Sequence, residues 1–281
     1  MAQLKSHIQD SGVSYLYTMT EMVINEIRDA YTYRYVTIAY VETTIRQKYR
    51  RSILGFFWSL LAPIMQFGAI GLIFYLTRVP DIPNYFSFAF FAAVGFNQIA
   101  ATLNSAPYIL VGNESYIKKI FVPKLTFVLN TACFESANFI LSFVGLCALG
   151  ILLGQVKLSW AIFFIPVSTL ITLVLLVGLS SVIAVGTVYF RDLTLIMPVL
   201  TQVSFFITPI FYRPENLGPK LSKLVYFNPL TYYVELYRQP IYSGSLPSLP
   251  NIVFCSILSF LCLFLGLWLL KKFDNKIVFK L

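Results

Sequence analysis

The residues that could do chemistry in this 281-residue chain are few and scattered. There is one histidine, His7, and the four cysteines, Cys133, Cys147, Cys255 and Cys262, all stand inside apolar runs. No group of His, Cys, Asp and Glu has the spacing of a metal site, and no Ser/His/Asp or Cys/His set is present for nucleophilic catalysis. Cysteines in apolar runs are more often packing residues than disulfides or ligands. We therefore expect neither an enzyme nor a metal or cofactor in this chain.

Ionisable side chains are almost absent from the long apolar runs, and Glu135 is the single carboxylate in their interior. Ion-coupled transporters usually bury several ionisable groups near the membrane midplane. A single carboxylate is therefore weak support for a proton or ion relay. Glu135 could equally be a structural residue that bonds to a neighbouring helix or snorkels toward the cytoplasmic leaflet. The chain also lacks a G-x-x-x-x-G-K-[ST] loop, so any ATP that drives its activity must be hydrolysed by another polypeptide.

The composition is that of a membrane protein. Hydrophobic residues make up 58% of the chain and charged residues 12%, with a mean hydropathy of +0.75. Long apolar runs without two-residue alternation indicate helices, because every backbone polar group in a bilayer must find its partner internally. The net charge of +9 could suggest nucleic acid, but the Lys and Arg residues stand at span ends instead. The predicted fold class is an all-α polytopic membrane protein that binds membrane lipids and no nucleic acid.

Six transmembrane helices are predicted from the apolar runs. They lie at 54–77, 86–110, 126–153, 160–188, 193–212 and 251–270. With both termini in the cytoplasm, fifteen of the 21 Lys and Arg residues fall in inside segments and six in outside segments, which favours an N-in, C-in topology. The chain thus divides into a cytoplasmic N-terminal segment at 1–53, a transmembrane domain at 54–271 and a cytoplasmic tail at 272–281.

The N-terminal segment lacks the apolar core and small-residue cleavage site of a secretory signal. Apolar residues between Tyr15 and Ile27 recur at three- and four-residue steps, which predicts an amphipathic helix lying at the membrane interface. A basic cluster directly before the first span assigns that side of the membrane to the cytoplasm. This cluster consists of Arg46, Lys48, Arg50 and Arg51.

The external segment 213–250 is too long for a turn and is divided by six of the fourteen prolines. Its pieces are too short to span the membrane, which predicts two short re-entrant helices between spans 5 and 6. Irregular backbone at membrane depth must face protein or a water-filled cavity, so the segment is expected to line an exit. Glu235 and Arg238 stand at i, i+3 and can pair on one of these helices. The alternative is an amphipathic cap on the surface with no transport role.

Four motifs follow one another in order along residues 40–271. They are RQKYRRSILGFFW at 46–58 with LLAP at 60–63, NESYIKKIFVP at 113–123, FRDL at 190–193 leading to TPIFY at 208–212, and NPLT at 228–231. Together they resemble the ABC-2 type polysaccharide-export permeases, and four collinear motifs are more specific than any one. Within that family the chain most resembles the membrane subunit of exporters for lipid-linked O antigens or wall teichoic acids, with capsule exporters more distant. The stretch 41–45 departs from the family's usual Arg-Asp pair.

The resemblance implies a homodimeric permease in the cytoplasmic (inner) membrane of a bacterium. Two copies of a separate ABC ATPase subunit would bind the ATP and Mg, and a polymer linked to a polyprenyl lipid would be pushed outward. Aromatic rings can stack on the apolar C–H faces of sugars while still letting a long chain slide. The family places spans 1 and 5 around the channel. Candidate channel aromatics there are Phe56, Phe57, Trp58, Phe67, Phe74, Tyr75, Phe205, Phe206, Phe211 and Tyr212.

The resemblance also assigns three further sets of residues. Residues 112–122 would form a short cytoplasmic helix seated in a groove of the ATPase, although Lys118 and Lys119 also fit an ordinary positive-inside loop. Its coupling residues are Glu114, Tyr116, Ile117, Lys118 and Lys119. The set that would meet the pyrophosphate of the lipid headgroup, or only anchor the chain in the membrane, is Arg46, Tyr49, Arg50 and Arg51. The external gate is assigned to Tyr232, Tyr233, Glu235, Tyr237 and Arg238.

Two other functions remain open. A related ABC-2 permease for small hydrophobic drugs or lipids would share the fold but would not need a wide aromatic tunnel. A membrane-embedded glycan-modifying enzyme would need clustered catalytic carboxylates or histidines on the external side. The outside segments offer only Asp81, Glu215 and Glu235, so the enzyme is the weaker hypothesis.

Overall fold

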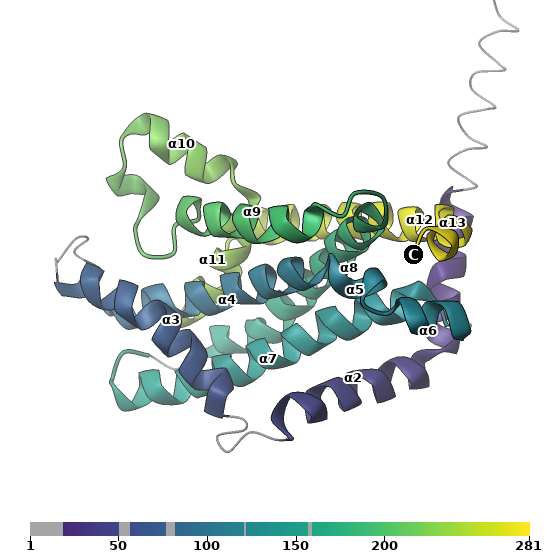
Figure 1. The fold of residues 1–281 in the computed structure, drawn as a ribbon. Helices are drawn as coiled ribbons and strands as arrows, with labels where there is room; N and C mark the ends of the chain where they lie inside the picture. The colour runs from purple at the N-terminus through teal and green to yellow at the C-terminus, as the bar shows by residue number, and fades with distance from the viewer. Residues whose placement is uncertain (1–18, 51–56, 77–81, 121, 157–158) are drawn as a thin grey trace, which may run out of the picture.

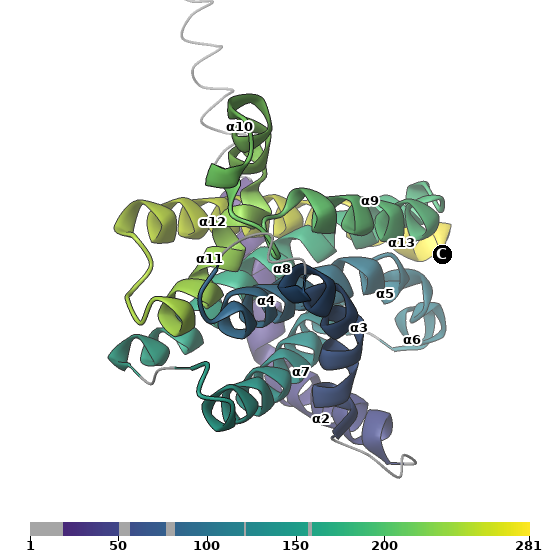
Figure 2. The same cartoon turned by 90° about the vertical axis from the view of Figure 1, so that its left-hand side faces the viewer.

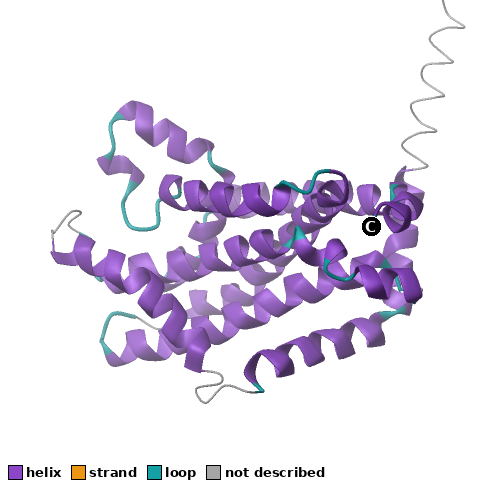
Figure 3. Cartoon of the chain, viewed as in Figure 1, coloured by secondary structure: helices purple, strands orange, loops and turns teal. Residues whose placement is uncertain are grey.

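The computed structural model describes residues 19–50, 57–76, 82–120, 122–156 and 159–281, and these contain helices and loops without a strand (Figure 3). A helix at 19–32 comes first. The others are α2 (Arg34–Tyr49), α3 (Phe57–Leu76), α4 (Tyr85–Ser105), α5 (Tyr108–Val111), α6 (Glu114–Lys119), α7 (Lys124–Leu152), α8 (Ile165–Tyr189), α9 (Leu193–Ile207), α10 (Pro219–Phe227), α11 (Pro229–Tyr242), α12 (Leu249–Lys272) and α13 (Asp274–Lys280). Two 3-10 helices, η1 (Trp160–Phe164) and η2 (Pro214–Asn216), precede α8 and α10.

Four helices of the described chain are long and apolar enough to cross a membrane, namely α4, α7, α8 with η1, and α12. The all-helical membrane fold is therefore confirmed. Helices α3, with 20 residues, and α9, with 15 residues, stand where the first and fifth spans are predicted. Fifteen residues reach about 22 Å at 1.5 Å per residue, which is short of a hydrocarbon core of about 30 Å. The count of six spans stays a prediction.

Helix α9 is shorter than the predicted span 193–212. It ends at Ile207, and Thr208 takes an extended conformation with φ −73° and ψ 132°. A residue before proline is pushed out of the helical region, and Thr208 precedes Pro209. Pro209 thus ends the helix, and the following residues turn back toward the bundle, where Ile210 and Phe211 are buried.

Helices α8 and α12 form the closest helix pair of the bundle, and Gly178 and Gly266 lie where they cross. A Cβ atom on Gly178 would stand 2.3 Å from the backbone carbon of Cys262, and one on Gly266 would stand 2.4 Å from the Gly178 oxygen. Small residues let membrane helices approach closely, and van der Waals packing then holds them together. The four cysteines are free thiols in the structure.

Helix α4 is the most enclosed of the four candidate spans, with 78% of its most apolar window buried. Side-chain hydrogen bonds tie it to its neighbours. Gln98 donates to Ser136 Oγ on α7 at 2.9 Å and accepts from Tyr237 Oη on α11 at 3.0 Å. Such bonds between apolar helices fix their register. Helices α3 and α9 also pack on α4, so α4 connects the external segment to the rest of the bundle.

The segment 213–250, which is predicted to be external and is called the external segment below, contains two short helices, α10 and α11. Prolines at first-turn positions begin η2, α10, α11 and α12, where the missing backbone N–H costs nothing. Helix α10 projects from the bundle, whereas α11 packs into it beside α4 and α8 (Figures 1 and 2). The two helices thus differ in how deeply they enter the fold.

The elements predicted to be cytoplasmic and external gather at opposite ends of the bundle. Helices α6 and α13 lie at one end beside the C-terminus, and α10 lies at the other (Figure 1). The helix at 19–32 joins the first end through Val23, which is buried in the main core cluster. Ile27, on the apolar stripe that is predicted to face the membrane interface, is 50% exposed.

Candidate functional site

Helix α6 holds the predicted coupling residues and lies on the surface. None of its residues is buried, and Tyr116 is 58% exposed. Lys118 donates to Glu114 Oε1 at 2.7 Å, an i, i+4 pair within the helix. Ile117 packs against the main hydrophobic core, so its side of α6 faces the bundle. The helix therefore presents a polar, partly aromatic surface to its surroundings.

Asn113 holds the start of α6 and was not among the predicted site residues. Its Nδ2 donates to the Ile109 carbonyl at 2.8 Å, and its Oδ1 accepts from Tyr40 Oη at 2.9 Å. Tyr40 is on α2, 73 positions earlier, so no local spacing reveals the contact. Helix α2 thereby becomes a support for α6.

A cluster of ion pairs lies beside α6. Lys271 of α12 pairs with Glu26 at 3.4 Å and with Asp29 at 2.9 Å, and Lys124 of α7 pairs with Asp274 of α13. Burial raises the pKa of Glu26, and the Lys271 ammonium partly offsets this effect. These pairs and α6 surround a pocket of about 350 Å³. The N-terminal helix, α7, α12 and α13 are thus linked next to the proposed coupling helix.

The predicted headgroup residues are on or just after α2. Arg46 is exposed and pairs with Glu42 one turn earlier, and Arg50 is also exposed. The side chain of Tyr49 and the whole of Arg51 lie outside the described residues. Both guanidinium groups are exposed, so an anionic membrane surface or lipid headgroup could reach them, with Arg46 already paired to Glu42.

Glu135 is half-buried on α7. It accepts from Asn138 Nδ2 at 3.2 Å, one turn along the same helix. On α2, Lys48 lies over the ring of Phe134 at 5.0 Å. This surrounding fits the structural interpretation of Glu135, with its bond within its own helix rather than to a neighbouring one.

The predicted channel aromatics of span 1 are only partly described. Phe57 and Trp58, at the start of α3, are 62% and 46% exposed. Phe56 and the side chains of Phe67, Phe74 and Tyr75 lie outside the described residues.

The four aromatics of span 5 do not share one face. Phe206 is 65% exposed and points away from the bundle. Phe205 contacts Phe96 of α4 at a centroid distance of 5.5 Å, and Phe211 is 6% exposed. Tyr212 is half-buried and donates to the Ile207 carbonyl at 2.8 Å. Of the four, Phe206 is the one whose side chain is mostly exposed.

The predicted gate residues of α11 divide between two faces. Tyr233 and Tyr237 are fully buried, and Tyr233 Oη bonds to the Cys255 carbonyl at 2.8 Å. Glu235 and Arg238 form the predicted i, i+3 ion pair. The spacing of Tyr233 and Tyr237 at i, i+4 is a sign of one buried stripe that the motif-based assignment did not use.

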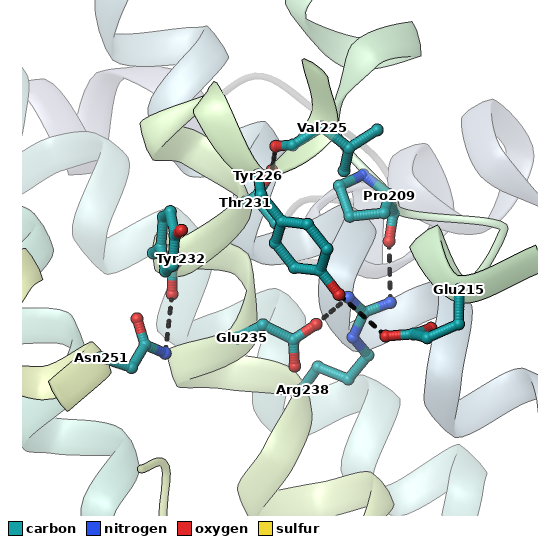
Figure 4. A network of polar contacts seen from close by, with 9 residues as sticks. All are labelled: Pro209, Glu215, Val225, Tyr226, Thr231, Tyr232, Glu235, Arg238 and Asn251. Carbon is teal, nitrogen blue, oxygen red and sulfur yellow. Dashed lines mark hydrogen bonds and ion pairs between the residues drawn. The ribbon is translucent and has the colours of Figure 1, made fainter. Parts of the chain in front are cut away.

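Arg238 is 2% exposed and is the centre of a polar network at the external end (Figure 4). Its Nη1 donates to the Pro209 carbonyl at 2.8 Å. Its guanidinium carbon lies 4.2 Å from the ring centre of Phe88 on α4. The network joins the turn after α9 to α4 and α11.

The arrangement offers binding surfaces and no catalytic constellation in the described part of the chain. No group of three His, Cys, Asp or Glu side chains there could hold a metal ion.

Comparison with known proteins agrees with this architecture. The O-antigen export system permease protein RfbA of Myxococcus xanthus is 26% identical over 227 residues, which cover 80% of this chain and 87% of that protein. An RfbA permease of Klebsiella pneumoniae is 25% identical, covering 81% of this chain and 88% of that protein. The polysialic acid transport protein KpsM of Escherichia coli is 20% identical, covering 81% and 89%.

The family model of the ABC-2 type transporter matches residues 35–242, which is more than half of the chain. The match runs from α2 through α11 and so includes α6 and the external network. This family consists of transporter permeases, which are not themselves catalytic. The chain therefore belongs to the ABC-2 type transporter family.

Proposed function

We propose that this chain is the membrane-spanning permease subunit of an ATP-driven exporter that moves a lipid-linked polysaccharide outward across the bacterial inner membrane. The polymer is of the O-antigen, teichoic acid or capsule type. The observation that carries the proposal is the likeness of 77–81% of the chain to three O-antigen export permeases. A likeness over that length includes both ends of the bundle, not only its apolar helices.

A separate ATPase subunit docks on α6 in this proposal. The helix is exposed, and Lys119 is not part of the Lys118–Glu114 pair, so α6 can fit into a groove on a partner. Ile117 anchors the helix to the core. The ion pairs of Lys271 and Lys124 lie beside it. Movement of α6 would thus reach the N-terminal helix, α12 and α13 directly.

A second copy of the chain covers α9. Six large apolar side chains of α9 are exposed. Four of them recur at spacings of three and four residues and form one stripe along the helix. They are Leu195, Val199, Val203 and Phe206. Two such faces, with the exposed ends of α3, would enclose a channel between the subunits. The proposed assembly is a homodimer with two ATPase copies, both termini facing the cytoplasm.

Cysteine cross-linking tests the dimer with a matched pair of valines. Val199 on α9 is 62% exposed and Val144 on α7 is 60% exposed. In native membranes under mild oxidation, Val199→Cys should give a covalent dimer and Val144→Cys should not. Equal cross-linking of both variants, or of neither, would contradict the assignment of α9 to the dimer interface.

The function itself is tested by deletion in the native host. Polyprenyl-linked glycan is measured in the cytoplasmic membrane and at the cell surface, with and without a plasmid copy. We expect the polymer to accumulate inside and to reach the surface again on complementation. Normal surface polymer together with greater sensitivity to hydrophobic toxins would instead indicate a small-molecule permease.

A further inference from the structure

A pocket at the external end has no role in the coupling or dimer proposals. It has a volume of about 340 Å³ and is formed by α4, η2, α10, α11 and the start of α12. That volume is at the lower end of the range of about 300–1,000 Å³ for small-molecule sites. A pocket of this size takes one or two sugar rings, not a folded partner.

The charges of the pocket balance. Two arginines, Arg213 and Arg238, face two carboxylates, Glu215 and Glu235. Arg238 is fully engaged with Glu235, the Pro209 carbonyl and the Phe88 ring. A site with equal numbers of each sign has no net attraction for a phosphate or a polyanion and suits a neutral, hydroxyl-rich ligand.

Tyr226 supplies a ring that other aromatics have not covered. Tyr232 already contacts Phe254 at 4.7 Å, and Tyr242 contacts Phe88 at 5.4 Å. Tyr226 has no aromatic contact among the described residues and is 43% exposed. Its hydroxyl donates to Glu215 Oε1 at 2.9 Å, which holds the ring at the rim of the pocket (Figure 4). A fixed ring at a pocket rim can stack on the C–H face of a sugar.

Planar polar groups complete the site. Arg213 donates from one nitrogen to Tyr242 Oη at 2.8 Å, and its other donors have no partner among the described residues. Glu235 uses one of its two oxygens for Arg238, and Gln239 lines the same pocket. Sugar hydroxyls both donate and accept, so a guanidinium, a carboxylate oxygen and an amide together match adjacent hydroxyls.

We propose that this pocket is a saccharide subsite that binds a neutral sugar unit of the polymer as it leaves the channel, with Tyr226 as the stacking platform. The inference rests on the proposed function, because it assumes that 213–250 faces the exit. It adds a binding site within each subunit, separate from the channel between subunits. A weak site of this kind would hold the emerging chain without stalling it.

Saturation-transfer NMR on the full-length permease in lipid nanodiscs tests the subsite. The probe is the oligosaccharide released by mild acid from the lipid-linked polymer of the native host. Tyr226→Ala should weaken binding about fivefold, because one ring contact is lost. Tyr226→Phe keeps the ring but loses the bond to Glu215, so it should weaken binding less than Tyr226→Ala does. The control is Phe227→Ala, which removes an 88%-exposed neighbour that does not line the pocket and should stay within about twofold of the wild type.

A second variant keeps the subsite testable if Tyr226→Ala does not fold. Arg213→Gln acts from a different segment and should also weaken binding, while the elution profile shows whether each variant is intact. Equal binding by the wild type, Tyr226→Ala and Arg213→Gln would overturn the subsite. That result would leave the proposed function standing if the wild-type gene still restores export in the deletion host. Failure to restore export would overturn the proposed function instead.

Discussion

At the external end of the bundle the Arg238–Glu235 pair is enclosed, with 3% and 26% of the two side chains exposed. At the other end the Lys118–Glu114 pair on α6 is open, with 43% and 42% exposed. In each pair the two residues stand one helical turn apart. An exposed pair contributes about 0–1 kcal/mol, whereas breaking an enclosed pair leaves a buried charge and costs about 3–5 kcal/mol.

The contrast indicates that a pair of opposite charges on one helix can either stabilise the fold, as on α11, or remain on the surface, as on α6. Helix α11 is part of the fold, since Tyr233, Tyr237 and Arg238 all bond inward. Helix α6 has no buried residue, so its polar side chains contribute little to the stability of the fold. Variants at the external end should therefore act on stability, and variants on α6 should act on association.

The largest effect is expected for Arg238→Ala. The change leaves Glu235 and the Pro209 carbonyl without their donor, at a cost of about 3 kcal/mol or more. For a chain of this size that corresponds to a fall in Tm of about 10 °C. The measurement is the thermal loss of the monodisperse peak of the purified permease in detergent.

Arg213→Ala is the matched control at the same end. Arg213 makes one hydrogen bond from a partly buried position, and its guanidinium carbon lies 6.0 Å from the ring centre of Phe88, so its loss should cost about 1 kcal/mol. Equal destabilisation by the two variants would show that enclosure of Arg238 is not what stabilises the external end.

The next effect concerns association with the ATPase. Replacing Lys118 and Lys119 together by Glu should reduce the co-purified ATPase about tenfold, the equivalent of about 1.4 kcal/mol. The Tm of the permease alone should change little, because both side chains are exposed.

The control is the same charge reversal at the other end, at Lys220 and Lys223 of α10, which are also exposed. This variant should retain the ATPase. Unchanged co-purification in the α6 variant, or equal loss in both, would remove the assignment of α6 as the docking helix.

The smallest effect is expected for Glu26→Gln. Since burial raises the pKa of Glu26, its ionised form is less favourable in the folded state than in the unfolded one. The folded wild type therefore gains stability as the pH falls through that raised pKa. At pH 8 the Tm of the variant should exceed the Tm of the wild type by less than about 4 °C. The gap should close toward pH 5, and a gap that widens there would contradict the assigned pKa direction.

Local signals in the sequence predicted much of the fold. Apolar runs placed α4, α7, α8 and α12, and prolines marked the starts of α10 and α11. The i, i+3 spacing of Glu235 and Arg238 gave their pairing correctly, because both residues are on one helix turn. The short helix within 112–122 was expected from the family resemblance and not from a local signal alone, and α6 (Glu114–Lys119) lies within that range.

Contacts between distant segments could not be predicted in this way. The bond of Tyr40 to Asn113 and the pairs of Lys271 with Glu26 and Asp29 join α2, α6, α12 and the N-terminal helix. The buried face of α11 likewise depends on which side meets α4 and α8, a choice that only tertiary packing makes. Assigning a residue such as Tyr237 to the gate does not specify which face of the helix it occupies.

The most direct test of the account is ATP-driven polymer movement in inside-out membrane vesicles from the host, carrying the permease and its ATPase. Labelled lipid-linked glycan on the outer, cytoplasmic face is probed with a lectin that cannot cross the membrane. With ATP, wild-type vesicles should protect the glycan from the lectin, and vesicles with Lys118 and Lys119 changed to Glu should not. Glycan that stays accessible in wild-type vesicles, while a small hydrophobic dye accumulates on ATP addition, would contradict polysaccharide export.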